Sequence, residues 1–393
     1  MGDSILVINC GSSSVRYALV HKDPARQRIS GKAERLGGDE ARLKGTDANG
    51  KPFSYSLDGA NHLEAMREIL KLLADQPLLA VGHRIVHGGE RFTKAASITP
   101  AVIRAIDTMG QLAPLHNPAN LIGVKATQQL YPELPQVAVF DTAFHQTLPP
   151  RAYRYAIPIR LYRQQGIRRY GFHGSSHAYI SQRVGFLSER CHGGWLIAHL
   201  GNGCSTCAVW QGESVDTSMG LTPLEGVVMG TRSGDVDPGL HAHLGRLGWS
   251  LEAIDNLLNN QSGLLGLSGL SNDMRTLEQA ASERHEAATL AIEVFCYRLA
   301  KSLAALSCGL PRLDGIVFTG GIGENASSIR ARVIDSLPHF NLRLSGSANA
   351  QTVGGKEARI DTGEPARPEV WVIPTDEESY IADETRRLLE NNE

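Results

Sequence analysis

Short apolar runs alternate with longer amphipathic stretches along this 393-residue chain. The runs at 81–86 and 136–140 have the length and composition of strands, whereas 285–306 has apolar residues at helical spacing and no interior proline or glycine. The Gly- and Asp-rich segment 38–60 predicts a peripheral turn or hairpin region, and 345–368 predicts loops. Strands that alternate with helices predict an α/β fold.

Two strand–turn–strand units have similar tips. Residues 5–20, ILVINCGSSSVRYALV, and residues 195–210, WLIAHLGNGCSTCAVW, each place an Asn, a Gly and small hydroxyl residues between apolar strands. The pair Asn202-Gly203 is a strong hairpin signal. The distance between the units is too long for a solenoid repeat and suits duplicated domains that face each other across a cleft. Coincidence between two hairpins is the alternative.

A third glycine cluster occupies residues 315–330, GIVFTGGIGENASSIR. It predicts a buried strand over 316–319, then a glycine turn, then a helix that begins near Asn325. Backbone N–H groups at such a turn favour phosphate or another anion. The run matches neither GxGxxG nor GxxxxGK[ST], so a plain turn is the competing interpretation.

Composition narrows the class of protein. Hydrophobic residues at 42% and charged residues at 20% are ordinary for a folded protein, and a net charge of −2 favours neither nucleic acid nor an anionic membrane as partner. We see no apolar run long enough to span a membrane and no secretory signal, so we expect a cytoplasmic protein. The six cysteines are too sparse for a disulfide framework, and Cys204 and Cys207 form a CxxC pair that lacks a second pair to complete a zinc site.

Basic residues recur beside glycine. GHRIVHGGERF contains Arg84, and GTRSGDVDPG contains Arg232. Arginine at a strand end or in a Gly/Pro-bounded loop is well placed to bind carboxylate or phosphate in a bidentate manner. The two arginines therefore suggest a reaction of anionic groups. His173 and His177 have the i, i+4 spacing of a zinc pair, but position 174 is Gly where HExxH has Glu.

Acidic residues follow two apolar runs. Asp141 follows QVAVF, and Glu377 and Glu378 follow VWVIPTD. Such acids can bind Mg²⁺ through oxygen, or they can be plain capping or solvated acids. Phosphate loops, a divalent metal and arginines together are what phosphoryl transfer requires.

The motifs that carry these residues resemble those of the acetate kinase family. They are VINCGSSSVRYALV, GHRIVHGGE, APLHNPAN, VFDTAFHQTLP, YGFHGSSH, HLGNGCS, DTSMGLTPLEGVVMGTRSGDVDPG, FTGGIGEN and IPTDEE, in family order from residue 5 to 382. The resemblance implies two duplicated ribonuclease H-like domains of the actin-like ATPase superfamily around a central cleft. It implies a first domain of residues 1–142 plus 379–393 and a nucleotide-binding domain of residues 143–378. It also implies a homodimer and reversible transfer of the ATP γ-phosphoryl group to acetate, which gives acetyl phosphate and ADP.

The resemblance assigns roles motif by motif. Arg84 and Arg232 would bind the carboxylate and the transferring phosphoryl group, and His173 would stabilise the transition state, with His116 nearby. Asp141 would sit at the catalytic centre, in a proton-handling or a metal-linked role. We favour the metal-linked role, because ionised acetate is already a nucleophile. The small apolar pocket for the methyl group would be formed by Val86, Leu115, Phe172 and Pro223, each of which could equally be plain core.

The resemblance also implies ligands for the nucleotide and the metal. Asn9 and Glu377 would hold Mg²⁺, with Mn²⁺ as an alternative ion. The residues assigned to ATP or ADP are Asn9, Ser12, Arg16, His199, Leu200, Gly201, Asn202, Gly203, Asp273, Met274, Arg275, Gly321, Ile322, Gly323, Glu324 and Asn325. The chain departs from the family at Arg16, where the pattern SSSLK has lysine, so the phosphate contacts of this position are open.

Two rival functions fit parts of the pattern. A propionate or butyrate kinase would use the same chemistry with a roomier pocket, since one methylene is worth only about 1–3 kcal/mol in such a site. A nucleotide-driven binding protein of the same superfamily would need the nucleotide loops but no small-acid site. A pyrophosphate-using relative is a minor third option, which the GGIGEN run disfavours.

Overall fold

The computed structural model describes residues 2–23, 25–47, 49–113 and 116–391. The chain divides into two compact units: unit 1 is Met1–Phe144 with Asp376–Glu393, and unit 2 is His145–Thr375. Glu377, which the sequence interpretation includes in the second domain, lies in unit 1.

Unit 1 is built on one mixed sheet with the strand order β5-β4-β3-β2-β1-β6-β8-β7. Strands β1, β6 and β8 run parallel to one another, and β1 to β5 form an antiparallel meander. The elements of unit 1 are β1 (Ser4–Gly11), β2 (Ser14–Val20), β3 (Ile29–Glu34), β4 (Arg42–Thr46), β5 (Pro52–Ser56), α1 (His62–Leu72), β6 (Leu78–Ile85), β7 (Ala96–Ser97), α2 (Pro100–Thr108), α3 (Asn117–Leu130), β8 (Gln136–Phe140) and α15 (Glu377–Glu390).

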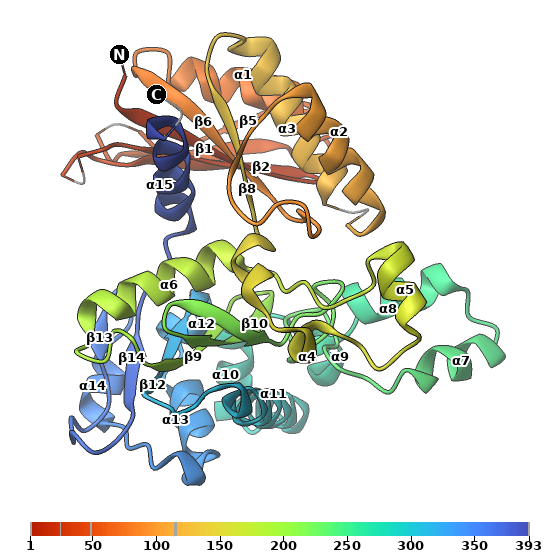
Figure 1. The fold of residues 1–393 in the computed structure, drawn as a ribbon, viewed down its shortest axis with the longest axis vertical. Helices are drawn as coiled ribbons and strands as arrows, with labels where there is room; N and C mark the ends of the chain where they lie inside the picture. Colours follow the sequence, from red (N-terminus) through yellow and green to blue (C-terminus); the bar gives the residue numbers. More distant parts are fainter. Residues whose placement is uncertain (1, 24, 48, 114–115, 392–393) are drawn as a thin grey trace. The chain divides into compact units, whose positions relative to one another are not determined.

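Helices cover both faces of this sheet (Figure 1), with α1, α2 and α3 on one face and α15 on the other. Strand β1 shows why both faces need cover, because all but one of its residues from Ser4 to Cys10 are buried. Leu6 and Ile8 pack with α1, whereas Ile5 and Val7 pack with Ile381 of α15. A strand buried on both faces is a near-continuous apolar run, as the sequence has at 5–8.

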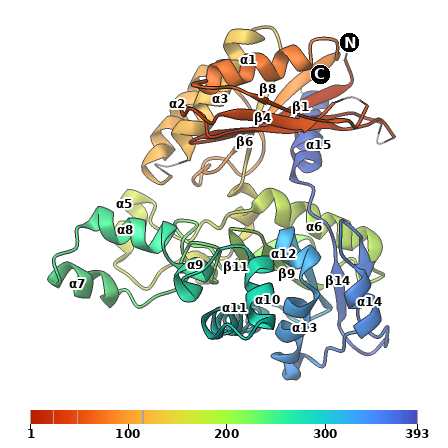
Figure 2. The same cartoon turned by 180° about the vertical axis from the view of Figure 1, so that it is seen from behind.

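Unit 2 contains a six-stranded sheet with the order β11-β10-β9-β12-β14-β13. Its strands are β9 (Gly194–Leu200), β10 (Cys204–Trp210), β11 (Glu213–Thr217), β12 (Gly315–Thr319), β13 (Ala358–Arg359) and β14 (Glu369–Val372). Its helices are α4 (Pro150–Tyr153), α5 (Ile159–Gln165), α6 (Gly174–Leu187), α7 (Gly239–Arg246), α8 (Leu251–Asn260), α9 (Gly263–Ser268), α10 (Met274–Ser282), α11 (Glu286–Leu306), α12 (Gly320–Asn325), α13 (Ser327–Asp335) and α14 (Gly346–Gln351). Helix α6 lies on one face of the sheet, and α10, α11 and α13 lie on the other (Figure 2).

The two sheets share one topology. In unit 1 the order β3-β2-β1-β6-β8 has an antiparallel meander followed by two parallel strands, and in unit 2 the order β11-β10-β9-β12-β14 repeats it. The two hairpins of similar sequence, β1–β2 and β9–β10, occupy the same place in their sheets. The predicted duplication of an α/β domain is therefore confirmed.

Most predicted elements form where the sequence places them. The strand predicted at 136–140 is β8, the helix predicted at 285–306 is α11 with His285 as its N-cap, and 38–60 contains the β4–β5 hairpin. The glycine turn predicted after β12 is wrong, because Gly320–Asn325 is itself a helix and the next one begins at Ser327. No helix in the described part of the chain is long and apolar enough to cross a membrane.

Candidate active site

Three polar side chains lie at the carboxyl ends of the parallel strands of unit 1. In the sheet register, Arg84 of β6 pairs with Val139 of β8, which lies two residues before Asp141. Ile8 of β1 pairs with His83 of β6, so Asn9 and Arg84 are the next residues along these two strands. A Cβ atom on Gly82 would meet the side chains of α15, so Arg84, two residues further on, points to that same face. Strand ends are where an α/β sheet presents functional groups.

Arg84 and Asp141 form an ion pair with two parallel hydrogen bonds. Nε of Arg84 donates to Oδ1 at 2.9 Å and Nη2 donates to Oδ2 at 2.6 Å, whereas Nη1 takes no part in these bonds. The Asp141 side chain is 2% exposed. Burial opposes the charge on Arg84, but the charges of Asp141 and Glu377 outweigh it and raise the pKa of the guanidinium. The guanidinium of Arg84 is therefore charged, and the two hydrogen bonds hold the pair in one geometry.

The first turn of α15 adds further acids to this edge of the sheet. Oε2 of Glu377 lies 4.0 Å from Nε of Arg84. The helix start is fixed by its N-cap Asp376, which accepts from Ser379 N and from both Nη atoms of Arg28 at 2.7–2.8 Å. Burial, with the nearby charge of Glu377, raises the pKa of Glu378.

The carboxyl edge of the unit 1 sheet, with the first turn of α15, suits a hard divalent cation that keeps much of its water. In the described residues no group of three or more His, Cys, Asp or Glu could hold a metal. Mg²⁺, however, is commonly held by one or two carboxylates and by substrate phosphates, with water in its remaining positions. Glu377, together with the amide oxygen of Asn9, offers oxygen donors of that kind, so the residues present fit the ion.

Two asparagines of α3 hold the loop that follows β6. Nδ2 of Asn120 donates to Cys10 O at 2.7 Å and its Oδ1 accepts from Val86 N at 3.0 Å, so one side chain joins the ends of β1 and β6. Asn117 makes two hydrogen bonds with the backbone of His87. His116 is half-buried at the N-cap of α3. Leu115, predicted to contact the substrate methyl group, lies outside the described residues.

The loop at the tip of β1 and β2 is open to solvent. Ser12 is exposed in the turn, and Arg16 is exposed directly across the strand pair from Asn9. Arg16 in turn lies opposite Lys32 of β3. The predicted nucleotide residues Asn9 and Arg16 are therefore neighbours on one face of the sheet.

In unit 2, His173 begins α6 with a left-handed backbone. Its φ of 56° and ψ of 28° are uncommon for a residue with a side chain. Phe172 before it is buried, and its carbonyl accepts from Nε2 of His145 at 3.0 Å. Strain of this kind is retained where the surroundings fix a functional group.

Arg232 and His173 converge above the tip of the β9–β10 hairpin. A Cβ atom built on Gly203 would lie 2.5 Å from Nη2 of Arg232 and 3.4 Å from Nε2 of His173. Only glycine leaves both side chains this close to the backbone, because any larger residue would displace the arginine. Nη1 of Arg232 donates to Pro223 O at 2.6 Å, which anchors the guanidinium to its own loop.

Arg232 differs from Arg84 in its lack of an acidic partner among the described residues. Within the described part of the chain, no carboxylate forms an ion pair with it, and burial lowers the pKa of its guanidinium. Arginine nevertheless stays protonated in proteins. A half-buried cation without a counter-ion is a site that an anion would stabilise.

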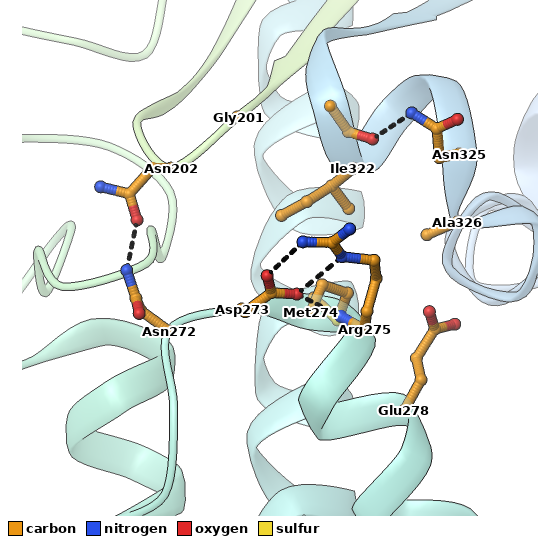
Figure 3. Close-up of a pocket in the computed structure, with 11 residues that line it drawn as sticks. Gly201, Asn202, Asn272, Asp273, Met274, Arg275, Glu278, Ile322, Asn325 and Ala326 are labelled. Atoms are coloured by element: carbon orange, nitrogen blue, oxygen red, sulfur yellow. Dashed lines mark hydrogen bonds and ion pairs between the residues drawn. The ribbon is translucent and has the colours of Figure 1, made fainter. Parts of the chain in front are cut away.

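A pocket of about 680 Å³ opens beside this hairpin (Figure 3). It is lined by Gly201, Asn202, Asn272, Asp273, Met274, Arg275, Glu278, Gly321, Ile322, Asn325 and Ala326. Nδ2 of Asn272 donates to Oδ1 of Asn202 at 2.9 Å, and Asp273 pairs with Arg275 at 2.7 Å. The pocket combines amide groups, a guanidinium and the apolar side chains of Met274 and Ile322, as sites for organic anions do.

Most of the predicted nucleotide residues of unit 2 line this pocket, and some do not. Leu200 and His199 are buried in β9, Gly323 is buried in α12, and Glu324 accepts hydrogen bonds from Gly320 N and Thr375 N. Gly203 does not line the pocket, and its backbone lies next to Nη2 of Arg232.

The sequence interpretation did not select Asn272, Glu278 and Ala326, which line the pocket. The sequence does contain a signal for Asn272, because this residue directly precedes Asp273 in the motif SNDMR. Glu278 follows from helical spacing, since it lies one turn after Met274 on α10.

The chain is similar over its whole length to proteins of known family. The sequence pattern of the acetokinase family matches residues 4–383. The chain belongs to the acetokinase family. An acetate kinase of Pseudomonas aeruginosa strain LESB58 is 57% identical, with 98% of this chain and 99% of that protein covered.

Solved structures of acetokinases give the same result. The crystal structure of Porphyromonas gingivalis acetate kinase is 42% identical with a TM-score of 0.92, covering 99% of this chain and 100% of that one. A propionate kinase from Francisella tularensis is also 42% identical with a TM-score of 0.92, covering 98% and 99%. These relatives share the fold of both units, and they include enzymes named for two different short acids.

Proposed function

We propose that this protein is an acetate kinase that transfers the γ-phosphoryl group of ATP to acetate, reversibly. A carboxylate oxygen attacks the γ-phosphorus, so a new O–P bond forms while the bond to the bridging oxygen of ADP breaks. The products are acetyl phosphate and ADP. No proton is transferred in this step, because acetate is already ionised at neutral pH.

The observation that carries the proposal is the convergence of Arg232 and His173 above Gly203. Negative charge spreads over the equatorial oxygens of a phosphoryl group in transfer, and fixed donors at that position lower the barrier. Arg232 suits this role because it is half-buried and lacks an acidic partner among the described residues. A binding protein that only senses nucleotide would have no need of such a cation.

The nucleotide would occupy the 680 Å³ pocket of unit 2. Met274 and Ile322 offer apolar surface to the adenine base, and Asn202 and Asn272 offer amide groups beside the hairpin that leads to Arg232. Both kinds of contact are typical of a cofactor-sized site.

The acetate carboxylate would bind Arg84. Its Nη1 takes no part in the bonds to Asp141, so this end of the guanidinium can donate to the substrate. Asp141 then holds Arg84 in place and balances part of its charge. Val86, Phe172 and Pro223 would contact the methyl group.

Asn9 and Glu377 would hold Mg²⁺, or Mn²⁺ in its place. The ion would supply charge neutralisation for the phosphate oxygens when it is bound. Arg84 and Arg232 remain the groups of this chain that bind the carboxylate and the phosphoryl oxygens.

The assembly would be a homodimer formed through unit 2, in the cytoplasm. Support comes from exposed large apolar side chains, of which the described residues include eight between 236 and 297: Val236, Leu247, Trp249, Leu251, Leu267, Leu270, Leu290 and Tyr297. Exposed apolar side chains that lie together commonly mark a protein interface. Sedimentation velocity tests this, and a monomer at micromolar concentration would contradict it.

The decisive experiment is hydroxylamine trapping of acyl phosphate by purified protein with MgATP and acetate, propionate or butyrate in separate reactions. We expect strong product with acetate that declines along the series. Preference for a longer acid would keep the mechanism and make the protein a propionate or butyrate kinase. Nucleotide binding without product from any of the three acids would overturn the proposal in favour of a nucleotide-driven binding protein.

A further inference from the structure

One buried hydroxyl group in unit 2 bridges two imidazole rings. Oγ of Ser205 lies 2.9 Å from Nδ1 of His173 and 2.8 Å from Nε2 of His177. Ser205 is on β10, directly opposite His199 of β9, on the face of the sheet that α6 covers. The two histidines come from the start of α6, four residues apart.

The direction of these hydrogen bonds follows from His177. Its ring is fully buried, and its Nδ1 has no hydrogen-bond partner in the described part of the chain. Burial and the neighbouring histidines hold the pKa of His177 well below its usual value, so the ring is neutral and carries one hydrogen. A hydrogen on Nδ1 would be a buried donor without an acceptor, which is costly. The hydrogen therefore belongs on Nε2, where it is donated to Ser205.

The hydroxyl of Ser205 has one hydrogen to donate. Since it accepts from His177, that hydrogen is directed to Nδ1 of His173. If both rings donated to Ser205 instead, the hydroxyl hydrogen would be buried without an acceptor. With Nδ1 of His173 as an acceptor, the hydrogen of a neutral His173 ring must be on Nε2.

Nε2 and Cε1 form the edge of the His173 ring nearest Gly203, each 3.4 Å from a Cβ atom built there, and Nη2 of Arg232 lies 2.5 Å from the same point. A lone pair on Nε2 would repel a phosphoryl oxygen, whereas an N–H donates to it. We propose that His177 and Ser205 are positioning residues that fix the tautomer of His173, so that its Nε2–H faces the phosphoryl group in transfer. The role in transfer rests on the proposed function, but the tautomer itself is a property of the protein without substrate.

The test is nitrogen-15 NMR of the histidine rings in protein labelled at histidine, without substrate, because ring nitrogen shifts separate N–H from bare nitrogen. His173→Gln identifies the His173 signals by their loss. We expect His173 in the wild-type protein to carry its hydrogen on Nε2 with Nδ1 as acceptor. A hydrogen on Nδ1 of neutral His173 would overturn the relay, and this result requires no variant of Ser205.

Variants of Ser205 connect the tautomer to turnover. Ser205→Ala removes the donor to Nδ1, so we expect the His173 Nδ1 signal to move toward that of a nitrogen without a hydrogen bond. We expect kcat to fall about 10- to 100-fold, as when other orienting groups are lost, with KM for ATP and acetate changed less than about twofold. Ser205→Thr keeps the hydroxyl and should restore both the signal and kcat. Wild-type kcat and an unmoved signal in Ser205→Ala would overturn the proposal.

Ser214→Ala is the matched control. Ser214 is also fully buried, and its Oγ lies 2.8 Å from Nδ1 of another buried histidine, His145. That variant removes a similar hydrogen bond, so we expect a similar loss of stability but no change in the His173 signals or in kcat. An equal fall in kcat in both variants would show that Ser205 has only a structural role, which would overturn the proposal.

The two proposals can fail separately. If wild-type protein carries the hydrogen on Nε2 of His173 but makes no acyl phosphate, the proposed function is wrong and the relay stands. If it makes acyl phosphate with the hydrogen on Nδ1, the function stands and the relay is wrong.

Discussion

Arg84 and Asp141 form a doubly hydrogen-bonded ion pair at the carboxyl ends of neighbouring parallel strands, with Nη2 and Oδ2 2.6 Å apart. The carboxylate of Asp141 is almost completely buried and depends on Arg84 for its charge, whereas Arg84 also lies 4.0 Å from Glu377. Removing one partner leaves an uncompensated charge, whereas removing both leaves none.

Asp141→Asn should therefore lower the free energy of unfolding by about 3 kcal/mol. The double variant Arg84→Met with Asp141→Leu should lose less than the single variant, since no buried charge remains. Urea unfolding followed by circular dichroism measures the stability of both variants. Tryptophan fluorescence would not report on unit 1, because all four tryptophans lie in unit 2: Trp195, Trp210, Trp249 and Trp371. A double variant less stable than Asp141→Asn would contradict the prediction.

Arg232→Ala should reduce kcat about 100- to 1,000-fold, the usual loss when one donor to a developing oxyanion is removed. Arg232→Lys should recover only part of it, since an ammonium group cannot reproduce the planar donor pair. The acyl phosphate assay measures kcat, and tryptophan fluorescence checks that unit 2 is folded. Arg246→Ala, an exposed arginine on α7, is the control and should have wild-type turnover. Near-normal kcat in Arg232→Ala would remove this residue from the site.

Ile322→Ala should raise KM for ATP about fivefold, because it removes roughly 1 kcal/mol of apolar contact from the nucleotide pocket. KM for acetate and kcat should change little, since the pocket holds no group that acts on the phosphoryl transfer. Initial rates at varied ATP measure the effect. Ile157→Ala makes the same change at an exposed position outside the pocket, and an equal rise in KM there would show that the effect is not local.

Regular elements were predictable where a local pattern determines them. Strand β8 is a continuous apolar run, and α11 has helical spacing and an uninterrupted interior, so neither depends on distant contacts. Helix α12 was missed because glycine is a poor helix former. Helix α12 is held by Glu324, whose carboxylate accepts hydrogen bonds from Gly320 N and Thr375 N. The bond from Thr375 joins residues 51 positions apart, which no local sequence pattern records.

The candidate site was predictable where a motif contains a charged group at the end of a strand or in a loop. Arg84 is of the first kind, and Arg232 and Asp273 are of the second. Ser205 was not, because a small hydroxyl residue in a buried strand has the same pattern as a core position. Its partners His173 and His177 come from another element, and only their distances to Oγ distinguish a relay from packing.

Acid should destabilise this fold between about pH 6.5 and pH 4 through its buried histidines. Burial lowers the pKa of His83, His87 and His145 from 6.5 to about 4. Below 6.5 the unfolded chain binds protons that the folded chain still excludes, so stability is lost as pH falls through this window and is intact above it. Each histidine should cost on the order of 1 kcal/mol at about pH 5.5.

His83→Gln tests this dependence. His83 is hydrogen-bonded to Gln136 in the core of unit 1, and glutamine at position 83 does not titrate. We expect the variant to be less stable than wild type at about pH 8 but to lose less further stability between pH 8 and about pH 5.5, measured by urea unfolding at each pH. His243→Gln, at an exposed position on α7, should leave the wild-type slope unchanged. If His83→Gln has the same slope as wild type, His83 is not one of the groups through which acid acts, because removing a buried neutral histidine must reduce the number of protons taken up on unfolding.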